Sequence, residues 1–326
     1  MEKVKLKNIE LESIKIKIGI SSCLLGNKVR FDGGHKKSDY LVDKMSPHVE
    51  FVTFCPEMEI GLGVPREAIR LIGNPKNPDL VSTKDPNKNY TDKMKKYAES
   101  IDEQITNLSG FIFKTKSPSC GPRSVNVYQG HGKIPQKGKG IFADSLIKNY
   151  PYLPYEDEGR LNDAVLRENF ITKVYTFSRF QDVIKNNLEI KNIIKFHERH
   201  KLIYMAHSIE YYKSMGSLVG NIKKYKLENF VEIYLKEMMD CLNLRPTKKK
   251  HANVLYHILG HFKKSIDSND KEQCIKLIED YRNNLKPLIT PITLLNYFLV
   301  KHEDNYLNEQ YYLNPYPDEL MLRNHI

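Results

Sequence analysis

The sequence predicts an α/β domain with a Rossmann-like parallel sheet over residues 1–170, followed by an all-α domain over residues 171–326. In the first half, short apolar runs alternate with helical patterns, which is typical of βαβ units. In the second half, helical spacing dominates. Between the two halves, residues 150–158 carry two prolines and an acidic run, which interrupt the alternation. A chain of 326 residues is long enough for two such domains.

Each element is predicted from its local pattern. Runs that alternate or are continuously apolar predict strands at 13–21, 49–54, 110–114 and 124–128. Helical patterns predict helices at 38–45, 91–108 and 141–148. The second of these begins at Thr91, a candidate cap, and Asp92 in its first turn suits the helix dipole. Irregular structure is expected at 61–65, 85–88 and 129–140, and turns in the second half at 243–246, 267–270 and 287–291.

The composition describes an ordinary soluble protein, with 40% hydrophobic and 28% charged residues. No apolar run approaches the roughly 18 residues of a membrane span, so no membrane is implied. The N-terminal segment is charged and lacks the apolar stretch of a signal peptide. We therefore expect a cytoplasmic protein with reduced cysteines. An odd number of widely spaced cysteines, five, argues against a disulfide framework.

The chain is basic, with a formal net charge of +11 and a pI of about 9.1. This balance favours a polyanionic partner, nucleic acid above all, because phosphate contacts drive such binding. The alternative is that the lysines reflect only the codon bias of an AT-rich genome. Basic segments that could contact phosphates share a high lysine content: 133–139, Lys223, Lys224, Lys226 and 245–250, which includes Lys248, Lys249 and Lys250.

Three cysteines follow the ends of predicted strands: Cys23, Cys55 and Cys120. Because the carboxyl ends of parallel strands meet at one edge of a sheet, these thiols could converge on one site. A zinc ion would need a fourth ligand from His35, Asp32 or Glu57. A [4Fe–4S] cluster held by three cysteines would keep one iron open. Three unrelated buried thiols are the simpler alternative.

Four motifs carry a resemblance to the thiouracil desulfurase (TudS-type) family, over roughly residues 15–165. They are Ser21-Ser-Cys-Leu-Leu-Gly26, Arg30-Phe-Asp-Gly-Gly34, Cys55-Pro-Glu57 and Ser117-Pro-Ser-Cys-Gly121. In the second half, Phe196-His-Glu-Arg-His-Lys201 and Met205-Ala-His-Ser208 resemble the all-helical domain of two-domain tRNA 4-thiouridine desulfurases.

The resemblance implies a redox-neutral desulfuration. Cys23, Cys55 and Cys120 would hold a [4Fe–4S] cluster whose open iron binds the thiocarbonyl sulfur of the substrate. Water would replace sulfur at the ring carbon, and sulfur would leave as hydrosulfide. This chemistry needs a Lewis acid, a base for water and hydrogen-bond donors. The partner implied is thiolated tRNA, and no protein partner is implied.

Glu57 is the candidate base, and Ser117 and Ser119 are candidates for orienting the base, the water or the pyrimidine. The simpler alternative is that Glu57 is only the acidic first-turn residue of a helix and that the serines only cap a helix or a turn. Arg30 and Asp32 could line the pocket, with Asp32 holding backbone amides or a base edge. An Asp-Gly turn closed by its own side chain is an equal alternative. Arg66 and Arg70 could touch a phosphate, although lone arginines more often lie solvated on a surface.

In the second half, one helix is predicted over about residues 188–215. Ile193, Phe196, His200, Ile203 and His207 form an apolar stripe whose histidines are expected in the core. His197, Lys201, Tyr204 and Ser208 form an adjacent stripe that suits contact with RNA, or alternatively a domain interface. Cys241 and Cys274 are expected to be core or partly buried thiols.

The function predicted is desulfuration of 4-thiouridine in tRNA, with the first domain performing the chemistry and the second presenting the RNA. One rival is a desulfurase of free thiouracil or thionucleotides whose helical domain serves dimerisation. A rival of another class is an iron–sulfur or zinc RNA-binding regulator without turnover.

Overall fold

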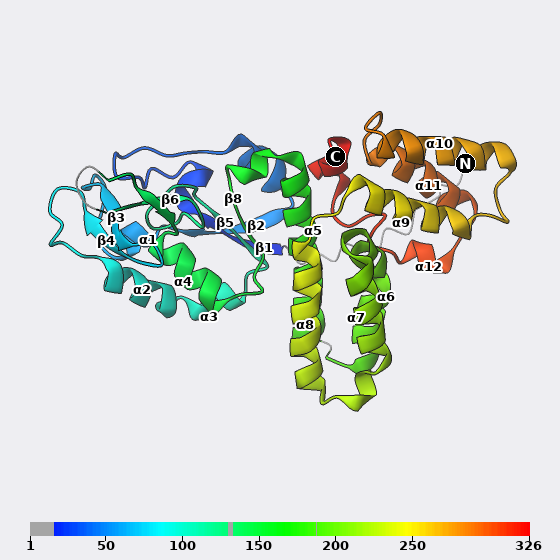
Figure 1. Ribbon diagram of the computed structural model, residues 1–326, viewed down its shortest axis with the longest axis horizontal. Helices are drawn as coiled ribbons and strands as arrows, with labels where there is room; N and C mark the ends of the chain where they lie inside the picture. The colour runs from blue at the N-terminus through cyan, green and yellow to red at the C-terminus, as the bar shows by residue number, and fades with distance from the viewer. Residues whose placement is uncertain (1–15, 130–132, 187) are drawn as a thin grey trace. The chain divides into compact units, whose positions relative to one another are not determined.

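The computed structural model describes residues 16–129, 133–186 and 188–326. These residues form two compact units, one up to Leu166 and the other from Arg167 onward. The first is an α/β unit built on a parallel sheet and the second is helical (Figure 1). The predicted fold class is therefore confirmed.

The first sheet is entirely parallel, in the strand order β2-β1-β5-β8. Its strands are β1 (Ile16–Ser21), β2 (Val49–Phe54), β5 (Gly110–Phe113) and β8 (Tyr155–Asp157). In the register, Ser21 at the end of β1 lies beside Phe54 at the end of β2, and Ile20 lies beside Ile112. The residues that follow β1, β2 and β5 therefore leave the sheet at the same edge. Residues 13–15 of the first predicted strand lie outside the described residues.

The core of this unit is dense around β5, whose four residues are all buried, as in a strand covered on both faces. The ring of Phe111 lies 4.3 Å from that of Phe113 and 5.3 Å from that of Phe54, between centroids. Gly19 of β1 faces this ring, and a Cβ there would come within 2.4 Å of it. Glycine is therefore the residue that fits beneath Phe111.

A second sheet has the order β4-β3-β6-β7 and mixed direction, and the sequence did not predict it as a sheet. Its strands are β3 (Ile69–Asn74), β4 (Asn77–Ser82), β6 (Val125–Tyr128) and β7 (Gln136–Gly138). The predicted strand at 124–128 is β6, but it pairs with β3 and β7 rather than with the parallel sheet. The segment expected to be a loop at 129–140 contains β7, and the Pro-rich segment at 150–158 contains β8.

Short helices complete the unit: α1 (Pro56–Glu59), α2 (Thr91–Ser100), α3 (Asp102–Thr106) and α4 (Ile141–Asn149). Helices α2 and α4 pack together, and Figure 1 shows them with α3 on one side of the strands. The helix predicted at 91–108 is divided at Ile101. Thr91 does not cap it, because its hydroxyl accepts from the Leu80 backbone N–H at 2.8 Å and so ties α2 to β4. Residues 40–45 form one π-helical turn.

The helical unit contains α5 (Ala164–Asn186), α6 (Ile190–His207), α7 (Ile209–Gly220), α8 (Leu227–Asn243), α9 (Lys248–His261), α10 (Ser268–Arg282), α11 (Ile289–Lys301) and α12 (Asn305–Asn308). Helices α6, α7 and α8 pack against one another (Figure 1). The single helix predicted at 188–215 is interrupted at Ser208, whose extended backbone ends α6 and whose hydroxyl caps α7 by accepting from Tyr211 N.

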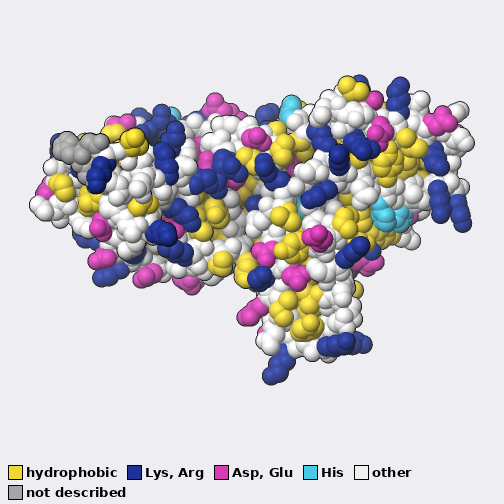
Figure 2. Space-filling model, viewed as in Figure 1, with side chains coloured by type: hydrophobic (Ala, Val, Ile, Leu, Met, Phe, Trp, Pro, Cys, Tyr) yellow, Lys and Arg dark blue, Asp and Glu magenta, His cyan; other side chains and the backbone are white. Residues whose placement is uncertain are grey.

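Lysine and arginine side chains are spread over the visible surface of both units (Figure 2). Within the described ranges, none of the helices has the length and apolar character needed to cross a bilayer.

Candidate active site at the carboxyl ends of the parallel strands

Three thiols meet at one cavity of about 350 Å³ beside the carboxyl ends of β1, β2 and β5. Cys23 lies in the 3₁₀ turn that follows β1, Cys55 is the residue between β2 and α1, and Cys120 lies beyond the end of β5. All five cysteines of the chain are free. The structure thus brings together three thiols that are far apart in sequence, as their positions after predicted strands indicate. The volume lies within the range of small-molecule sites, about 300–1,000 Å³.

The environment of these thiols disfavours free thiolates. Burial raises the pKa of Cys23 to about 11, although the nearby Lys114 ammonium opposes the shift. Burial also raises the pKa of Cys55, and it raises that of Cys120 well above its ordinary value, with a further contribution from the Glu57 carboxylate. Without a bound cation the thiols are therefore protonated at neutral pH. Such groups suit metal binding, which displaces the proton, better than nucleophilic attack.

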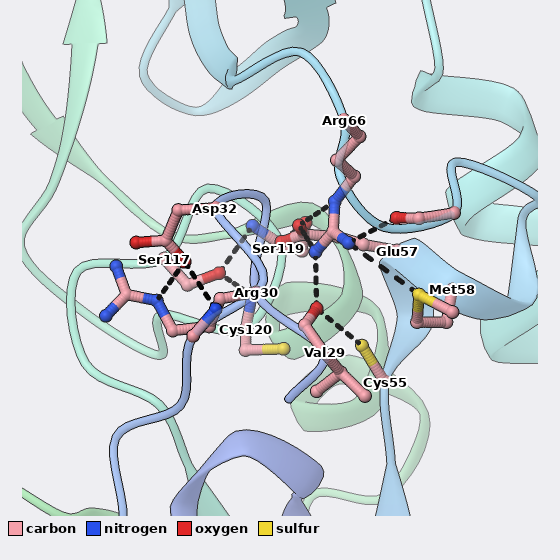
Figure 3. A network of polar contacts seen from close by, with 12 residues as sticks. Val29, Arg30, Asp32, Cys55, Glu57, Met58, Arg66, Ser117, Ser119 and Cys120 are labelled. Atoms are coloured by element: carbon pink, nitrogen blue, oxygen red, sulfur yellow. Dashed lines mark hydrogen bonds and ion pairs between the residues drawn. The ribbon is translucent and has the colours of Figure 1, made fainter. Parts of the chain in front are cut away.

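The Glu57 carboxylate lines the same cavity and is held from two sides (Figure 3). Its Oε2 accepts from Nε and Nη2 of Arg66, at 3.0 and 2.5 Å. Its Oε1 accepts from the Ser119 hydroxyl at 2.9 Å. Glu57 lies in the first turn of α1, where a carboxylate also suits the helix dipole. Glu57 is thus an acidic first-turn residue of a helix, as the simpler alternative expects, and it also lines the cavity.

The side chain of Arg66 is buried, so the expectation that it is a solvated surface residue is wrong. Only 5% of its side chain is exposed. Besides Glu57, its guanidinium contacts two backbone carbonyls, Gly63 O at 2.7 Å and Val29 O at 2.9 Å. Sequence reasoning named Arg66 only as a possible phosphate contact and missed its contact with Glu57. No motif marks this contact, which arises only when residues 29, 57 and 63 come together. Arg70 instead lies over the Tyr128 ring.

Ser117 and Ser119 play different parts in the turn before Cys120. Ser119 is fully buried and donates to the Glu57 carboxylate, so it contacts this candidate base but does not line the cavity. Ser117 lines the cavity, and its Oγ accepts from the backbone N–H groups of Ser119 and Cys120 at 3.2 and 3.1 Å. The turn closes when Gly121 N donates to Ser117 O, and a Cβ on Gly121 would lie 2.7 Å from that oxygen.

In the loop after Cys23, Arg30 lines the cavity and Asp32 does not. Asp32 is exposed, and its Oδ1 accepts from Gly34 N at 3.0 Å, a contact that lowers the pKa of the carboxyl. Asp32 therefore forms the Asp-Gly turn closed by its own side chain, which was one of the two alternatives for this residue. Phe31, which sequence reasoning did not single out, lies at the cavity with 42% of its surface exposed.

Basic side chains dominate the lining of the cavity. Among the described lining residues Glu57 is the one carboxylate, whereas the cations are Arg30, Lys36, Arg66, Lys114 and Lys116. Arg66 is paired with Glu57, and the Lys114 ammonium is paired with Glu158. Lys36 and Lys116 are exposed. The cavity therefore favours an anionic group near its opening.

The donor set does not fit a single zinc ion. Zn–S bonds of about 2.3 Å hold the sulfurs of one tetrahedral site within about 4 Å of each other. Among the residues that the structure describes, no three His, Cys, Asp or Glu side chains are arranged to hold one metal ion. Three thiols that line one cavity are the donor set that a polynuclear cluster would need, because its own irons and sulfides separate the cysteine ligands.

In the helical unit, most candidate RNA-binding side chains already have partners. The Lys201 ammonium lies 4.5 Å from the Tyr306 ring centroid, and that of Lys248 lies 5.2 Å from Tyr281. Lys250 donates to His207 O at 2.5 Å, at the carboxyl end of α6, where a cation suits the helix dipole. Lys249 is exposed. None of these four residues lines the described cavity.

The stripe expected to contact RNA or another domain is largely interior. His197 and Tyr204 are buried, and both contact the hydroxyl of Tyr234, at 3.1 and 3.3 Å. These side chains are therefore not available to stack on bases. The expectation that His200 and His207 belong to the core is confirmed. Cys241 and Cys274 are likewise buried.

Comparison with known proteins assigns two segments of the chain. Residues 18–158 match the family described as 2-thiouracil desulfurase, and residues 201–317 match a family described as a protein of unknown function, DUF1722. The first match lies within the α/β unit and the second within the helical unit. All three cavity cysteines, Glu57 and both serines lie within the first match.

Two individual proteins are similar to parts of the chain. The uncharacterized protein YbgA of Escherichia coli (strain K12) is 26% identical over 157 residues, which are 48% of this chain and 93% of that protein. A solved structure of a [4Fe–4S]-dependent thiouracil desulfidase, TudS, is 28% identical and covers 45% of this chain and 94% of its own, with a TM-score of 0.37.

Proposed function

We propose that this protein removes sulfur from 4-thiouridine in tRNA, giving uridine and hydrosulfide, with a [4Fe–4S] cluster as cofactor. The observation that carries the proposal is the convergence of Cys23, Cys55, Cys120 and Glu57 on one cavity. This cavity lies within the segment that matches the 2-thiouracil desulfurase family. The two features together provide cofactor ligands and a base beside a space of the size of a small ligand.

The three cysteines would hold the cluster. When bound, it would leave one iron without a protein ligand, and this iron would act as a Lewis acid on the thiocarbonyl sulfur. The protonated, buried state of the free thiols means that assembly of the cluster must release protons.

The remaining steps belong to side chains of this protein. Glu57 accepts a proton from the water that adds to the ring carbon, while Ser119 and Arg66 keep its carboxylate in place. Water supplies the oxygen of the product and two protons. One proton passes through Glu57 to solvent and the other leaves with sulfur as hydrosulfide, so no oxidant or reductant is consumed. Ser117, which also lines the cavity, is the residue that we assign to contact with the pyrimidine.

The distribution of cations supports a phosphate-bearing substrate over free thiouracil, which carries no phosphate. Lys36 and Lys116 are exposed at the cavity. In the helical unit, the connection between α7 and α8 presents Lys223, Lys224 and Lys226 around the exposed Tyr225, and Figure 2 shows cations at that end. Cations interleaved with an aromatic ring suit contact with phosphates and stacking on an unpaired base. The exposed Lys249 would add a further contact.

Turnover with competing substrates tests the proposal. Anaerobically reconstituted protein is incubated in parallel with thiolated tRNA and with free 2-thiouracil, and nucleosides and free bases are quantified. Loss of 4-thiouridine from tRNA supports the proposal. If only free thiouracil is consumed, the RNA substrate is wrong. If both persist while RNA is bound, the protein is a regulator without turnover.

The cofactor ligands are tested separately. Replacing Cys23, Cys55 or Cys120 by Ala should abolish the brown absorbance and the iron content. Cys241→Ala is the matched control, because this thiol is buried in the helical unit and lines no part of the cavity. An unchanged spectrum after any one of the first three changes removes that residue as a ligand.

A further inference from the structure

The Arg66 guanidinium connects the candidate base to a candidate cluster ligand. It bonds to the Glu57 carboxylate through two nitrogens and to Val29 O at 2.9 Å through Nη2. The same Val29 oxygen lies 3.9 Å from the Cys55 sulfur. Gly63 O at 2.7 Å and the Met58 sulfur at 3.7 Å complete its surroundings (Figure 3). The planar fork is therefore fixed on all sides.

This arrangement makes the two oxygens of Glu57 unequal. A carboxylate oxygen offers about two lone pairs. Oε2 accepts two N–H groups of Arg66, which occupy both. Oε1 accepts one hydroxyl, from Ser119, and keeps one lone pair. Since Glu57 lines the cavity, Oε1 is the oxygen that can accept a proton from water there.

We infer that Arg66 is a positioning residue that holds Glu57 with Oε1 directed to the reacting water. The inference rests on the proposed function, because it concerns the base of that reaction. A shift of about 1 Å in a reacting group can cost about 100-fold in rate. Loss of the guanidinium frees Oε2 and allows the carboxylate to rotate about its remaining contact with Ser119.

Lysine cannot reproduce these contacts. Its ammonium is a compact charge with three donors, whereas Arg66 uses a rigid fork to reach a carboxylate and two carbonyls simultaneously. Arg66→Lys should keep the charge and part of the orientation, whereas Arg66→Met should keep only the packing of the side-chain stem.

A double-mutant cycle tests the inference. Steady-state kinetics on thiolated tRNA are measured for wild type, Arg66→Met, Arg66→Lys, Glu57→Gln and the double variant, with absorbance of the cluster recorded for each. We expect Arg66→Met to lower kcat about 100-fold with KM unchanged, and Arg66→Lys to be intermediate. In the Glu57→Gln background, Arg66→Met should cause no further loss. Arg70→Met is the matched control, because Arg70 lies over Tyr128 and lines no part of the cavity.

The outcomes separate this inference from the proposed function. If Glu57→Gln turns over at the wild-type rate, the base assignment fails and the proposed mechanism with it. If Glu57→Gln is inactive but Arg66→Lys and Arg66→Met have wild-type kcat, only the role of Arg66 is wrong. An equal loss from Arg66→Met in both backgrounds, or a rise in KM alone, also overturns it. If Arg66→Met loses the absorbance of the cluster, its kinetics are not informative and Arg66→Lys is used instead. A wild-type kcat for Arg66→Lys then contradicts the inference.

Discussion

Ser119→Ala is the change that separates orientation of the base from shaping of the cysteine turn. The substitution removes one hydroxyl from a fully buried position and leaves the backbone contacts of the turn unchanged. The lost contact is the 2.9 Å hydrogen bond to Oε1 of Glu57. Arg66 continues to hold Oε2, so the carboxylate loses one of its two anchors.

The size of the effect follows from this geometry. A hydrogen bond to a charged group contributes about 1.5–3 kcal/mol. Because 15% of the Glu57 side chain is exposed and the side chain lines the cavity, water can partly replace the hydroxyl, which favours the lower value. About 1.5 kcal/mol corresponds to roughly a tenfold change in rate. We expect Ser119→Ala to lower kcat about tenfold and to keep the cluster.

Ser117→Ala should behave differently, because Ser117 Oγ accepts the backbone N–H of Cys120 and of Ser119. Its loss loosens the turn that places Cys120, so we expect reduced iron content. The assay is steady-state desulfuration with iron and sulfide determined on the same samples. A Ser119→Ala variant with wild-type kcat, or one that loses its iron, would refute the reasoning.

Three further predictions concern the substrate, the helical unit and the core. Replacing Lys36 and Lys116 by Ala should raise KM for thiolated tRNA and flatten its salt dependence, while leaving free thiouracil unaffected; an unchanged salt slope places the phosphates elsewhere. Burial lowers the pKa of His207 to about 4 from 6.5. Between pH 6.5 and about pH 4, the unfolded chain therefore binds a proton at His207 that the folded unit does not. The free energy of unfolding falls as pH falls through this range, by about 2 kcal/mol near pH 5. In urea unfolding of cluster-free protein, His207→Asn should lose that part of the pH dependence, and equal pH dependence in both proteins contradicts the assignment. Gly19→Ala should destabilise the α/β unit by about 1–3 kcal/mol, because its Cβ would meet Phe111, and an unchanged melting temperature would show that the ring can move.

The sequence predicts the part of the fold that positions the thiols. Strands β1, β2 and β5 are short apolar runs, and the turn chemistry that follows each is explicit in Ser22-Cys23, Cys55-Pro56 and Ser117-Pro118. Parallel pairing then brings these ends to one edge. The fold class alone is enough to bring the three cysteines together, because each follows a parallel strand. This is why the sequence pattern predicts their convergence.

The second sheet is hidden because its strands do not have a simple strand pattern. Strand β4 contains Pro78, and β3 contains Gly73, which adopts a positive φ of 85° one residue before the strand ends at Asn74. The edge strand of the first sheet, β8, was missed for a different reason: it carries Glu156 and Asp157, which are buried but paired with Arg123. Acidic residues argue against a buried strand when only the local sequence is considered, because the partner that allows their burial is distant in the chain.

Arg66 shows the same limit within the site. A lone arginine after Gly63 and Pro65 has no local feature that distinguishes it from a solvated residue. Its burial depends on a carboxylate nine residues earlier and on a carbonyl 37 residues earlier. Likewise, the helical spacing of His197 and Tyr204 fits an exposed stripe and a core stripe equally, and only the packing of α6 against α8 decides.

The most direct test of the account is desulfuration of thiolated tRNA in water labelled with the heavy isotope of oxygen. The reconstituted protein reacts anaerobically without added reductant, and mass spectrometry of the nucleosides is compared with the hydrosulfide released. The account predicts uridine that carries one heavy oxygen, in amounts equal to the hydrosulfide and to the 4-thiouridine lost. Persistence of 4-thiouridine, or uridine without the heavy isotope, would contradict it.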